Sequence, residues 1–207
     1  MTTVRSGLPT PTWRLLNYGV QPTKSTRKQV EDKQGMLEDY SEIDKKLADL
    51  NGNTSAFRVS EDAAHIEGMS QEVSETLFYG NQDTEEAAFT GIAPRFNSLT
   101  AENGGQIVNA GGSGSDNTSI YFACWDPNVA FLHFPKGSKA GLQFQDLGEV
   151  TLEDDNGGKY QGYRSHYKWD LGFCLRDWKQ WARIANIDVS DLSGAGGSGY
   201  SGPDLPL

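Results

Sequence analysis

Few residues in this sequence could serve as acids, bases, nucleophiles or metal ligands, and their spacing limits what they can do. The chain has three histidines, His65, His133 and His166, and none lies in a His-Glu-x-x-His motif. Its two cysteines, Cys124 and Cys174, are too far apart for a Cys-x-x-Cys motif. The sequence therefore lacks the usual ligand spacing of a zinc site.

Two looser pairs of reactive side chains remain, and each has a simpler interpretation. Glu61 and His65 are four residues apart and could share a metal on a helix, but an ordinary side-chain pair is the preferred interpretation. Cys124 and His166 could form a nucleophile and base, yet Cys124 lies in the apolar run Tyr121–Trp125. A buried, inert thiol is the better interpretation of that cysteine.

Glycine-rich and acidic segments give no nucleotide or calcium site. The loop at Gly111–Gly114 lacks the Gly-Lys-Ser/Thr ending of a phosphate cradle, and Pro135–Lys139 lacks the glycine that should precede it. The carboxylates of Glu153–Asp155 are explained by a solvated hairpin turn. We therefore expect no enzyme activity, no metal and no cofactor.

Composition indicates a modest domain that buries surface against other chains. The 207 residues fit one domain, or one domain with a long arm, and only 36% are hydrophobic although 11% are aromatic. The net charge of -10 disfavours a broad nucleic-acid surface, so no sequence-specific nucleic-acid partner is expected. No apolar run is long enough to span a membrane, and no membrane partner is expected.

The first 30 residues favour an extended, hairpin-like arm. Pro9, Pro11 and Pro22 oppose a helix, because proline lacks an amide donor and pushes the preceding residue toward extended backbone. The arm is basic within an acidic chain, which indicates contact with an acidic neighbouring surface, although a solvated loop is the alternative. Its basic residues are Arg5, Arg14, Lys24, Arg27 and Lys28.

A long helix is predicted from Thr54 to Tyr79, after a strand from Met36 and a helical turn at Lys45–Leu50. Six apolar residues recur every three or four positions and should form its buried stripe. Candidate N-caps lie at 53–55 and Ser60, and Gly80 is predicted to end the helix in a left-handed conformation. The stripe consists of Val59, Ala63, Ile66, Met69, Val73 and Leu77.

Strands are predicted after a mobile, solvent-facing connection at Gly111–Asn117. Residues 120–125 and 129–134 read as one hairpin, and 149–152 and 160–169 as another, joined by the turn at 155–158. Residues 173–187 are compatible with a strand or a helix, and a strand is favoured. Residues 193–207 are rich in glycine and resemble a flexible linker.

The order of these segments, and several long runs within them, resembles the major capsid proteins of tailed bacteriophages with the Hong Kong 97-type fold. The resemblance covers nearly the whole chain. It rests on Arg5–Arg14, Gly19–Pro22, Leu47–Asn53, Ser60–Asp62, His65–Met69, Leu77–Asn81, Phe89–Asn97, Gly111–Ile120, Pro135–Leu142, Arg164–Tyr167 and on to Asp188.

That resemblance implies an α+β fold with an extended β-hairpin loop, a long spine helix and an antiparallel sheet. Residues 1–35 would be the loop laid over a neighbouring subunit, and 36–110 the peripheral domain with its spine helix at 54–79. Residues 111–192 would supply strands of the peripheral and axial domains, followed by the tail at 193–207. The expected inter-subunit contacts are Leu8, Trp13, Arg14 and Tyr18.

The resemblance also implies that the chain is a structural subunit that assembles into capsomers and a shell around the packaged genome. Scaffolding, portal and decoration proteins are further candidate partners. Assembly in the host cytoplasm and residence in the virion are expected. Compared with the family pattern, an N-terminal arm and a C-terminal part of the axial domain are expected to be missing, so the chain reads as a fragment.

Two functions of other classes stay open on the residues alone. A β-rich carbohydrate- or receptor-binding module would use exposed tryptophans for stacking, with candidates Trp125, Trp169, Trp178 and Trp181. A soluble hydrolase would use Glu153–Asp155 and His166. A long amphipathic helix is unusual in the first class, and the second lacks a recognisable motif.

Overall fold

The computed structural model describes residues 1–50, 52 and 54–190, so the predicted tail at 193–207 and the candidate cap Asn53 lie outside the described residues. Contacts between segments divide the chain into two compact units. The first unit comprises Met1–Glu31, Arg95–Phe131 and the described part of Cys174–Leu207. The second unit comprises Asp32–Pro94 and Leu132–Phe173.

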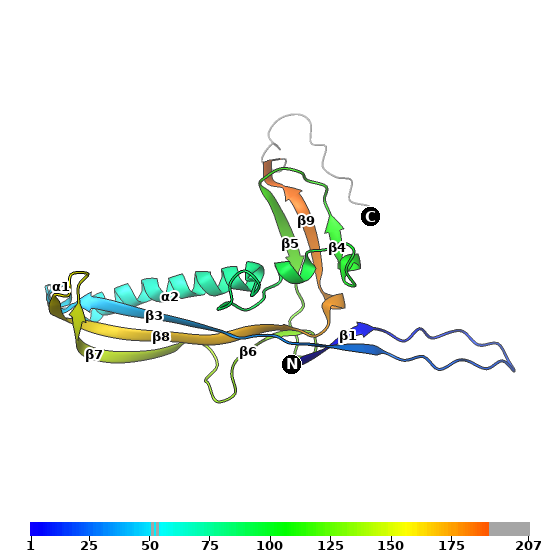
Figure 1. Ribbon diagram of the computed structural model, residues 1–207, viewed down its shortest axis with the longest axis horizontal. Coiled ribbons are helices and arrows are strands. Elements are labelled where there is room, and N and C mark those ends of the chain that lie inside the picture. Colours follow the sequence, from blue (N-terminus) through cyan, green and yellow to red (C-terminus); the bar gives the residue numbers. More distant parts are fainter. Residues whose placement is uncertain (51, 53, 191–207) are drawn as a thin grey trace. The chain divides into compact units, whose positions relative to one another are not determined.

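A sheet built around one long strand organises the second unit (Figure 1). Strand β8 (Lys159–Leu175) pairs with β3 (Gly35–Asp44), β6 (Ala130–His133) and β7 (Gln143–Glu153). Both β3 and β7 run antiparallel to β8. The predicted hairpin between β7 and β8 is confirmed, and Gly157 supplies the positive φ of 82° that its turn requires.

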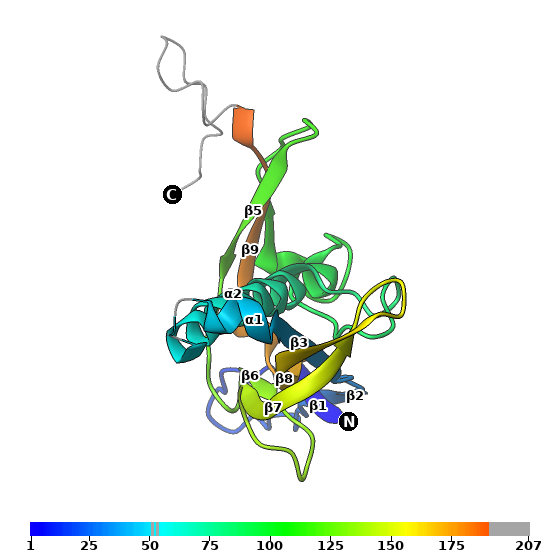
Figure 2. The same ribbon diagram turned by 90° about the vertical axis from the view of Figure 1, so that its left-hand side faces the viewer.

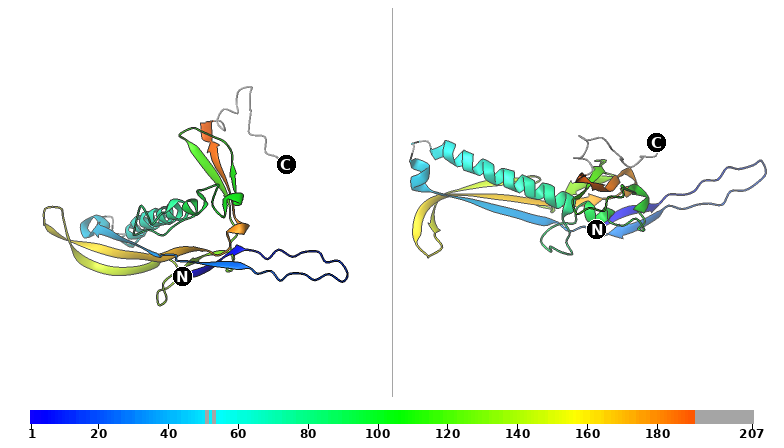
Figure 3. Two further views of the ribbon diagram at one scale, coloured as in Figure 1. Left: turned by 45° about the vertical axis from the view of Figure 1, so that its right-hand side comes forward. Right: turned by 90° about the horizontal axis from the view of Figure 1, so that it is seen from above.

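Two helices follow β3, as the sequence predicts. Helix α1 spans Lys45–Asp49 and is capped by Asp44, whose carboxylate accepts a hydrogen bond from the Lys46 amide. Helix α2 spans Thr54–Tyr79, the predicted 26 residues, and lies along β3 and β8 in both views of Figure 3. The strand, helical turn and long helix expected between residues 36 and 79 are therefore confirmed.

The C-terminal end of α2 differs from the prediction, because Gly80 has no positive φ. Its amide continues the helical pattern by donating to the Thr76 carbonyl at 2.9 Å. A Cβ at Gly80 would lie 2.6 Å from the Phe89 carbonyl oxygen, so close approach of the chain, and not left-handed backbone, requires glycine here.

The buried face of α2 is also rotated from the predicted stripe. Met69 is buried and Val73 and Leu77 are half-buried, but Val59 and Ile66 are exposed, as is Ala63. The helix turns Arg58, Asp62 and His65 toward the sheet, so its first half packs through polar groups. A periodicity argument that counts only apolar residues cannot find a polar inward face, and the prediction is wrong for Val59, Ala63 and Ile66 within this chain.

The core of the second unit is small and lies under α2 and along the centre of the sheet. Burial of these apolar side chains is the main stabilising term for the unit. The fully or nearly fully buried residues are Ile43, Met69, Phe89, Ile92, Leu152, Tyr167, Leu171 and Phe173.

The first unit contains a ribbon and a mixed sheet. Strands β1 (Thr2–Gly7) and β2 (Thr26–Val30) form an antiparallel ribbon. Strand β9 (Ala182–Asp188) pairs antiparallel with β5 (Asn117–Phe122) and parallel with β4 (Ile107–Asn109), and Figure 2 shows β5 and β9 side by side. The favoured strand at 173–187 is confirmed in two pieces, the end of β8 and β9, separated by a 3₁₀ turn at Trp178–Gln180.

One predicted hairpin is wrong. Residues 120–125 and 129–134 are not paired strands, because β5 pairs with β9 while β6 pairs with β8. Between them, Asp126 forms a tight local turn by accepting hydrogen bonds from the Asn128 and Val129 amides. Turn-forming residues between two apolar runs predict the turn, but they do not predict which strand pairs with which.

The connection at 111–117 is mostly exposed, as expected, but it makes specific contacts. The Gly112 amide donates to the Asn186 carbonyl at 2.8 Å, and Asn117 Nδ2 donates to the Gly112 carbonyl at 3.2 Å. A Cβ at Gly112 would lie 2.5 Å from that Asn186 oxygen. The glycine therefore permits close approach to β9, while the mobility of the loop stays a prediction.

The fold as a whole is α and β with mainly antiparallel sheets, which confirms the coarse fold class.

Candidate functional site

The arm is a ribbon with a long loop at residues 8–25 that has almost no regular structure (Figure 1). At its base, β1 and β2 pair from Thr2 opposite Val30 to Gly7 opposite Thr26. Near its tip, a turn brings the Tyr18 amide to the Leu15 carbonyl at 3.2 Å, with Asn17 at a φ of 67°. Asparagine tolerates this left-handed backbone better than most residues do. The predicted hairpin-like arm is confirmed.

The apolar side chains of the loop contact solvent. Trp13 is 104% exposed, so it makes no packing contact within the described chain. Leu8 and Tyr18 are exposed by 59% and 68%, and Arg14 is also exposed. Such a concentration of exposed large apolar side chains is uncommon on a monomer and marks a surface that binds another molecule.

The base of the ribbon is fixed within the first unit. Val4 is buried, and the Arg5 amide donates to the Arg176 carbonyl at 3.2 Å. A Cβ at Gly7 would overlap the Thr26 hydroxyl, so glycine allows the strands to approach where their register shifts. A fixed base with an unpacked loop is an arrangement suited to presenting the loop to a partner.

The positive charge of the arm is not neutralised by any ion pair within the described part of the chain. None of Arg5, Arg14, Lys24, Arg27 and Lys28 forms an ion pair with any residue that the structure describes. In a chain of net charge -10, this region favours an acidic partner.

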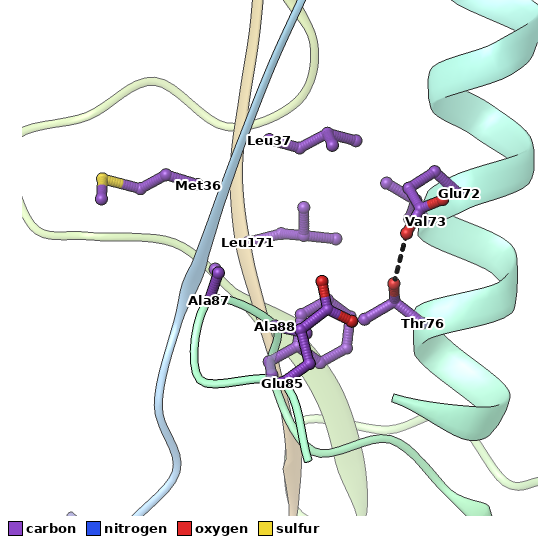
Figure 4. A pocket seen from close by; sticks show the side chains of 11 residues that line it. Met36, Leu37, Glu72, Val73, Thr76, Glu85, Ala87, Ala88 and Leu171 are labelled. Carbon is purple, nitrogen blue, oxygen red and sulfur yellow. Dashed lines mark hydrogen bonds between the residues drawn. The ribbon is translucent and has the colours of Figure 1, made fainter. Parts of the chain in front are cut away.

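The second unit contains a small, mainly apolar cavity between β3 and α2, with a volume of about 100 Å³. Figure 4 shows Leu37 and Leu171 directed toward Val73, while Met36 points away from them. Glu72 and Glu85 lie at its edge, and Glu72 accepts a hydrogen bond from Thr76. The cavity could accept one apolar side chain beside two carboxylates.

The polar contacts of α2 with the sheet are the clearest electrostatic feature of the second unit. The Arg58 guanidinium donates to Asp146 Oδ1 at 2.7 Å and lies 4.9 Å from the centre of the Tyr163 ring. The hydrogen bond from Arg58, helped by the Gly148 amide, holds the pKa of Asp146 below its usual value. Burial, together with the Asp62 carboxylate, raises the pKa of Tyr167 to about 12.

The histidines that could have done chemistry are engaged in structural pairs. His65 Nδ1 lies 2.6 Å from Asp39 Oδ2, so its partner is a carboxylate on β3 and not Glu61. His166 Nε2 lies 3.1 Å from Glu38, and its ring stacks on Tyr40 with 4.4 Å between centroids. Within the described residues, no group of three or more His, Cys, Asp or Glu side chains could hold a metal ion.

The acidic turn and the cysteines also have structural explanations. Asp154 accepts hydrogen bonds from the Asn156 and Gly158 amides, as expected for a hairpin turn. Cys174 is buried and Cys124 is half-buried, and both are free thiols. Cys124 Sγ lies 3.6 Å from Gln180 Oε1, so the prediction of a fully buried thiol is wrong for this residue.

The four candidate tryptophans differ in exposure: Trp181 is buried, whereas Trp125 is 51% exposed. Trp181 donates through Nε1 to the Cys124 carbonyl at 3.1 Å, and packs against Phe96 and Trp125. Trp169, on β8 in the second unit, and Trp178 are half-buried. Trp181 is therefore a core anchor and is not available for sugar stacking.

None of the helices within the described residues is long and apolar enough to cross a membrane.

Two comparisons with known proteins give the family, and a third gives nothing. Residues 1–201 match the family described as Major capsid protein GP7. A chain in the near-atomic structure of bacteriophage Epsilon15 is 41% identical, with a TM-score of 0.62 over 96% of this chain and 60% of that one. The search of curated proteins gave no match.

Two other capsid structures share weaker similarity. A chain of the capsid of an empty GTA particle is 10% identical with a TM-score of 0.43, covering 90% of this chain and 85% of that one. A chain of the satellite phage P4 procapsid, which includes the size determination protein Sid, is 11% identical with a TM-score of 0.37, covering 88% and 86%.

The match to the family extends over nearly the whole sequence, and the similarity to Epsilon15 agrees with it. The chain spans 60% of the length of the Epsilon15 chain that it matches. With the exposed basic arm, the long helix and the antiparallel sheet in place, the chain belongs to the major capsid protein GP7 family.

Proposed function

We propose that this chain is a structural subunit of a bacteriophage icosahedral capsid shell and contacts neighbouring copies through its arm. The observation that carries the proposal is the full exposure of Trp13 in a loop whose base is fixed. An exposed tryptophan beside an arginine is the combination that most often dominates interface energies. Membership of a capsid protein family gives the partner as another copy of the chain.

In this proposal, Leu8, Trp13, Arg14 and Tyr18 are inter-subunit contacts. The cavity between β3 and α2 is a suitable receptor, because it has an apolar lining and two carboxylates that could pair with Arg14. Burying an apolar side chain of the arm in such a site removes apolar surface from water, and pairing a guanidinium with a carboxylate adds a charge-assisted hydrogen bond.

In this proposal the chain is a Hong Kong 97-type capsid subunit. Residues 1–35 form its extended loop, and α2 is the spine helix of its peripheral domain. The length and bounds of α2 support this assignment, as does the long β8 strand beneath it. Residues 36–110 would belong to the peripheral domain and 111–192 to strands of the peripheral and axial domains.

The proposed product is a set of capsomers that close into a shell in the host cytoplasm and remain in the virion. Scaffolding, portal and decoration proteins are candidate partners. The acidic net charge suits a container wall that does not bind packaged DNA tightly.

Expression of the chain followed by negative-stain electron microscopy tests the proposal. Closed shells or isolated capsomers are expected in the high-molecular-weight fraction from sedimentation. If only a monodisperse monomer were found, even at protein concentrations well above those in the expressing cell, the proposal would be contradicted.

A further inference from the structure

Arginines make up half of the residues that line a cavity on one face of the arm's base. Its volume is about 270 Å³, and it lies within the first unit. Three of its lining residues, Arg5, Arg27 and Arg176, carry guanidinium groups, and Asp177 is its only acidic residue among those described. The cavity therefore has an excess of positive charge in a chain whose net charge is -10.

The strand pairing of the arm creates this charge. Arg5 lies directly opposite Arg27 in the antiparallel ladder, so both side chains stand on the same face of the ribbon. Thr3, two residues from Arg5, lines the cavity on that face, while Val4 turns to the other face and is buried. Like charges placed opposite one another destabilise an isolated ribbon.

Contacts of the neighbouring segment hold the third arginine in place. The Arg176 amide donates to the Val129 carbonyl at 2.7 Å, and its Nη1 donates to the Pro127 carbonyl at 3.2 Å. The Asp177 carboxylate accepts a hydrogen bond from the Lys179 amide at 3.2 Å, so part of its capacity is used by a local turn. Within the described residues, neither Arg5 nor Arg27 has an ion-pair partner.

Planar guanidinium groups that converge on one cavity recognise carboxylate or phosphate oxygens, because their donors match two acceptor oxygens at once. We propose that Arg5, Arg27 and Arg176 form a carboxylate-binding site that receives the acidic β7–β8 turn of a second copy of this chain. The proposal rests on the proposed function, since it needs copies of the chain to meet one another.

The β7–β8 turn is an exposed acidic segment that suits this site. Glu153, Asp154 and Asp155 are consecutive and stand at the end of a hairpin paired from Gln143 to Lys168, which holds them in a defined position. Glu153 already pairs with Lys159, and Asp154 is used by the turn. Asp155 is exposed and makes no ion pair or side-chain hydrogen bond within the described residues, so its carboxylate is available.

A charge exchange tests this pairing. Arg27→Asp and Asp155→Arg should each lower the yield of particles about tenfold, and the double variant should recover most of that loss, as expected of two groups in direct contact. Lys139→Asp is the control: Lys139 is an exposed basic residue outside the arm and makes no ion pair within the described residues. It should leave particle yield within about threefold of the unsubstituted chain.

Three results would overturn the site: single variants that assemble normally, a double variant that does not recover, or an equal loss with Lys139→Asp. Because the substituted residues are exposed, all variants should melt within a few degrees of the parent, which separates assembly from folding. If instead Arg27→Asp assembles normally but loses retention of DNA on a filter, the ligand is a phosphate and the carboxylate assignment is wrong.

Failure of the proposed function gives a different result, namely no particles from the unsubstituted chain. The pairing is then read from disulfide trapping at high concentration in a Cys124→Ser background. A mixture of Arg27→Cys chains and Asp155→Cys chains should form disulfides faster than a mixture of Lys28→Cys chains and Asp155→Cys chains. Lys28 is the next residue of β2 and lies on the opposite face of the ribbon. Equal rates would overturn the proposed pairing.

Discussion

At the scale of single residues, several glycines and ion pairs decide how segments approach one another. Gly91 is the clearest example, because the segment around it folds back on the end of α2. Its amide donates to the Gly80 carbonyl at 2.8 Å, and the next amide, of Ile92, donates to the Leu77 carbonyl at 2.9 Å. These bonds satisfy backbone groups that a helix end would otherwise leave unpaired.

Gly91→Ala should destabilise the chain. The new Cβ would lie 2.5 Å from the Thr76 carbonyl oxygen and 2.6 Å from that of Leu77, so the backbone must shift. We expect a loss of about 1–3 kcal/mol in the free energy of unfolding, the usual cost of overpacking. Urea denaturation measures it.

Gly68→Ala is the matched control. Gly68 lies within α2, is exposed, and has open space around its missing Cβ. Alanine there should stabilise the chain by about 0.5–1 kcal/mol through helix propensity. If Gly91→Ala and Gly68→Ala changed the free energy of unfolding by the same amount and in the same direction, the contact at Gly91 would not be the cause.

The ion pair of Arg58 with Asp146 should make stability depend on pH in the acid range. The pKa of Asp146 is lowered in the folded chain from its ordinary value of 3.8, chiefly by its hydrogen bond with Arg58. Its contribution is therefore fully present well above pH 3.8 and is lost as the pH falls through the folded-state pKa.

The Asp146→Asn variant should show a weaker dependence of stability on pH in the acid range. The variant should melt lower than the parent at neutral pH, and the difference between them should shrink as the pH is lowered toward the pKa of the carboxyl group. Thermal melts across the acid range measure both. A difference that stays constant with pH would contradict a role for this carboxylate.

At the scale of elements, the sequence predicts local structure well and pairing poorly. The presence of α2, of the strand before it and of the β7–β8 hairpin follows from periodicity and an Asn-Gly turn. The partner of β5 does not, because the paired residues of β9 lie 60 to 71 positions further along the chain and the pairing depends on the packing of the whole unit. The contact between the base of the arm and Arg176 could not be predicted either, because the two segments are far apart in sequence.

The face of α2 is the most informative error at this scale. Counting apolar residues favours Val59, Ala63 and Ile66, whereas the helix turns Arg58 and His65 toward the sheet. The apolar stripe is inward only from Met69 onward. Tertiary ion pairs from β3 and β7, which local sequence does not contain, decide the rotation of the first half.

Met69→Ala should therefore cost more than Ile66→Ala. Met69 is 4% exposed and leaves a cavity when truncated, with an expected loss of about 2–3 kcal/mol in the free energy of unfolding. Ile66 is 40% exposed and should cost less than about 1 kcal/mol in the monomer. Chemical denaturation of the two variants at one protein concentration compares them, and a larger loss for Ile66→Ala would mean that the helix is rotated.

At the scale of the whole molecule, the residues of the candidate site could be predicted, but their surroundings could not. An apolar, proline-containing arm with Trp13 and Arg14 is visible in the sequence, and its lack of a local core already indicates a partner. The arginine cavity at its base depends on β1–β2 register and on a segment at 176, which only the folded unit brings together.

The central claim is that the arm joins copies of the chain and contributes little to folding within one copy. Particle yield and monomer melting, measured together on Trp13→Ala with Arg14→Glu, test it most directly. Because Trp13 is fully exposed, the melting temperature of the monomer should be unchanged, while shells and capsomers should fall at least about tenfold. Normal particle yield from this variant, or a large fall in its melting temperature, would contradict the account.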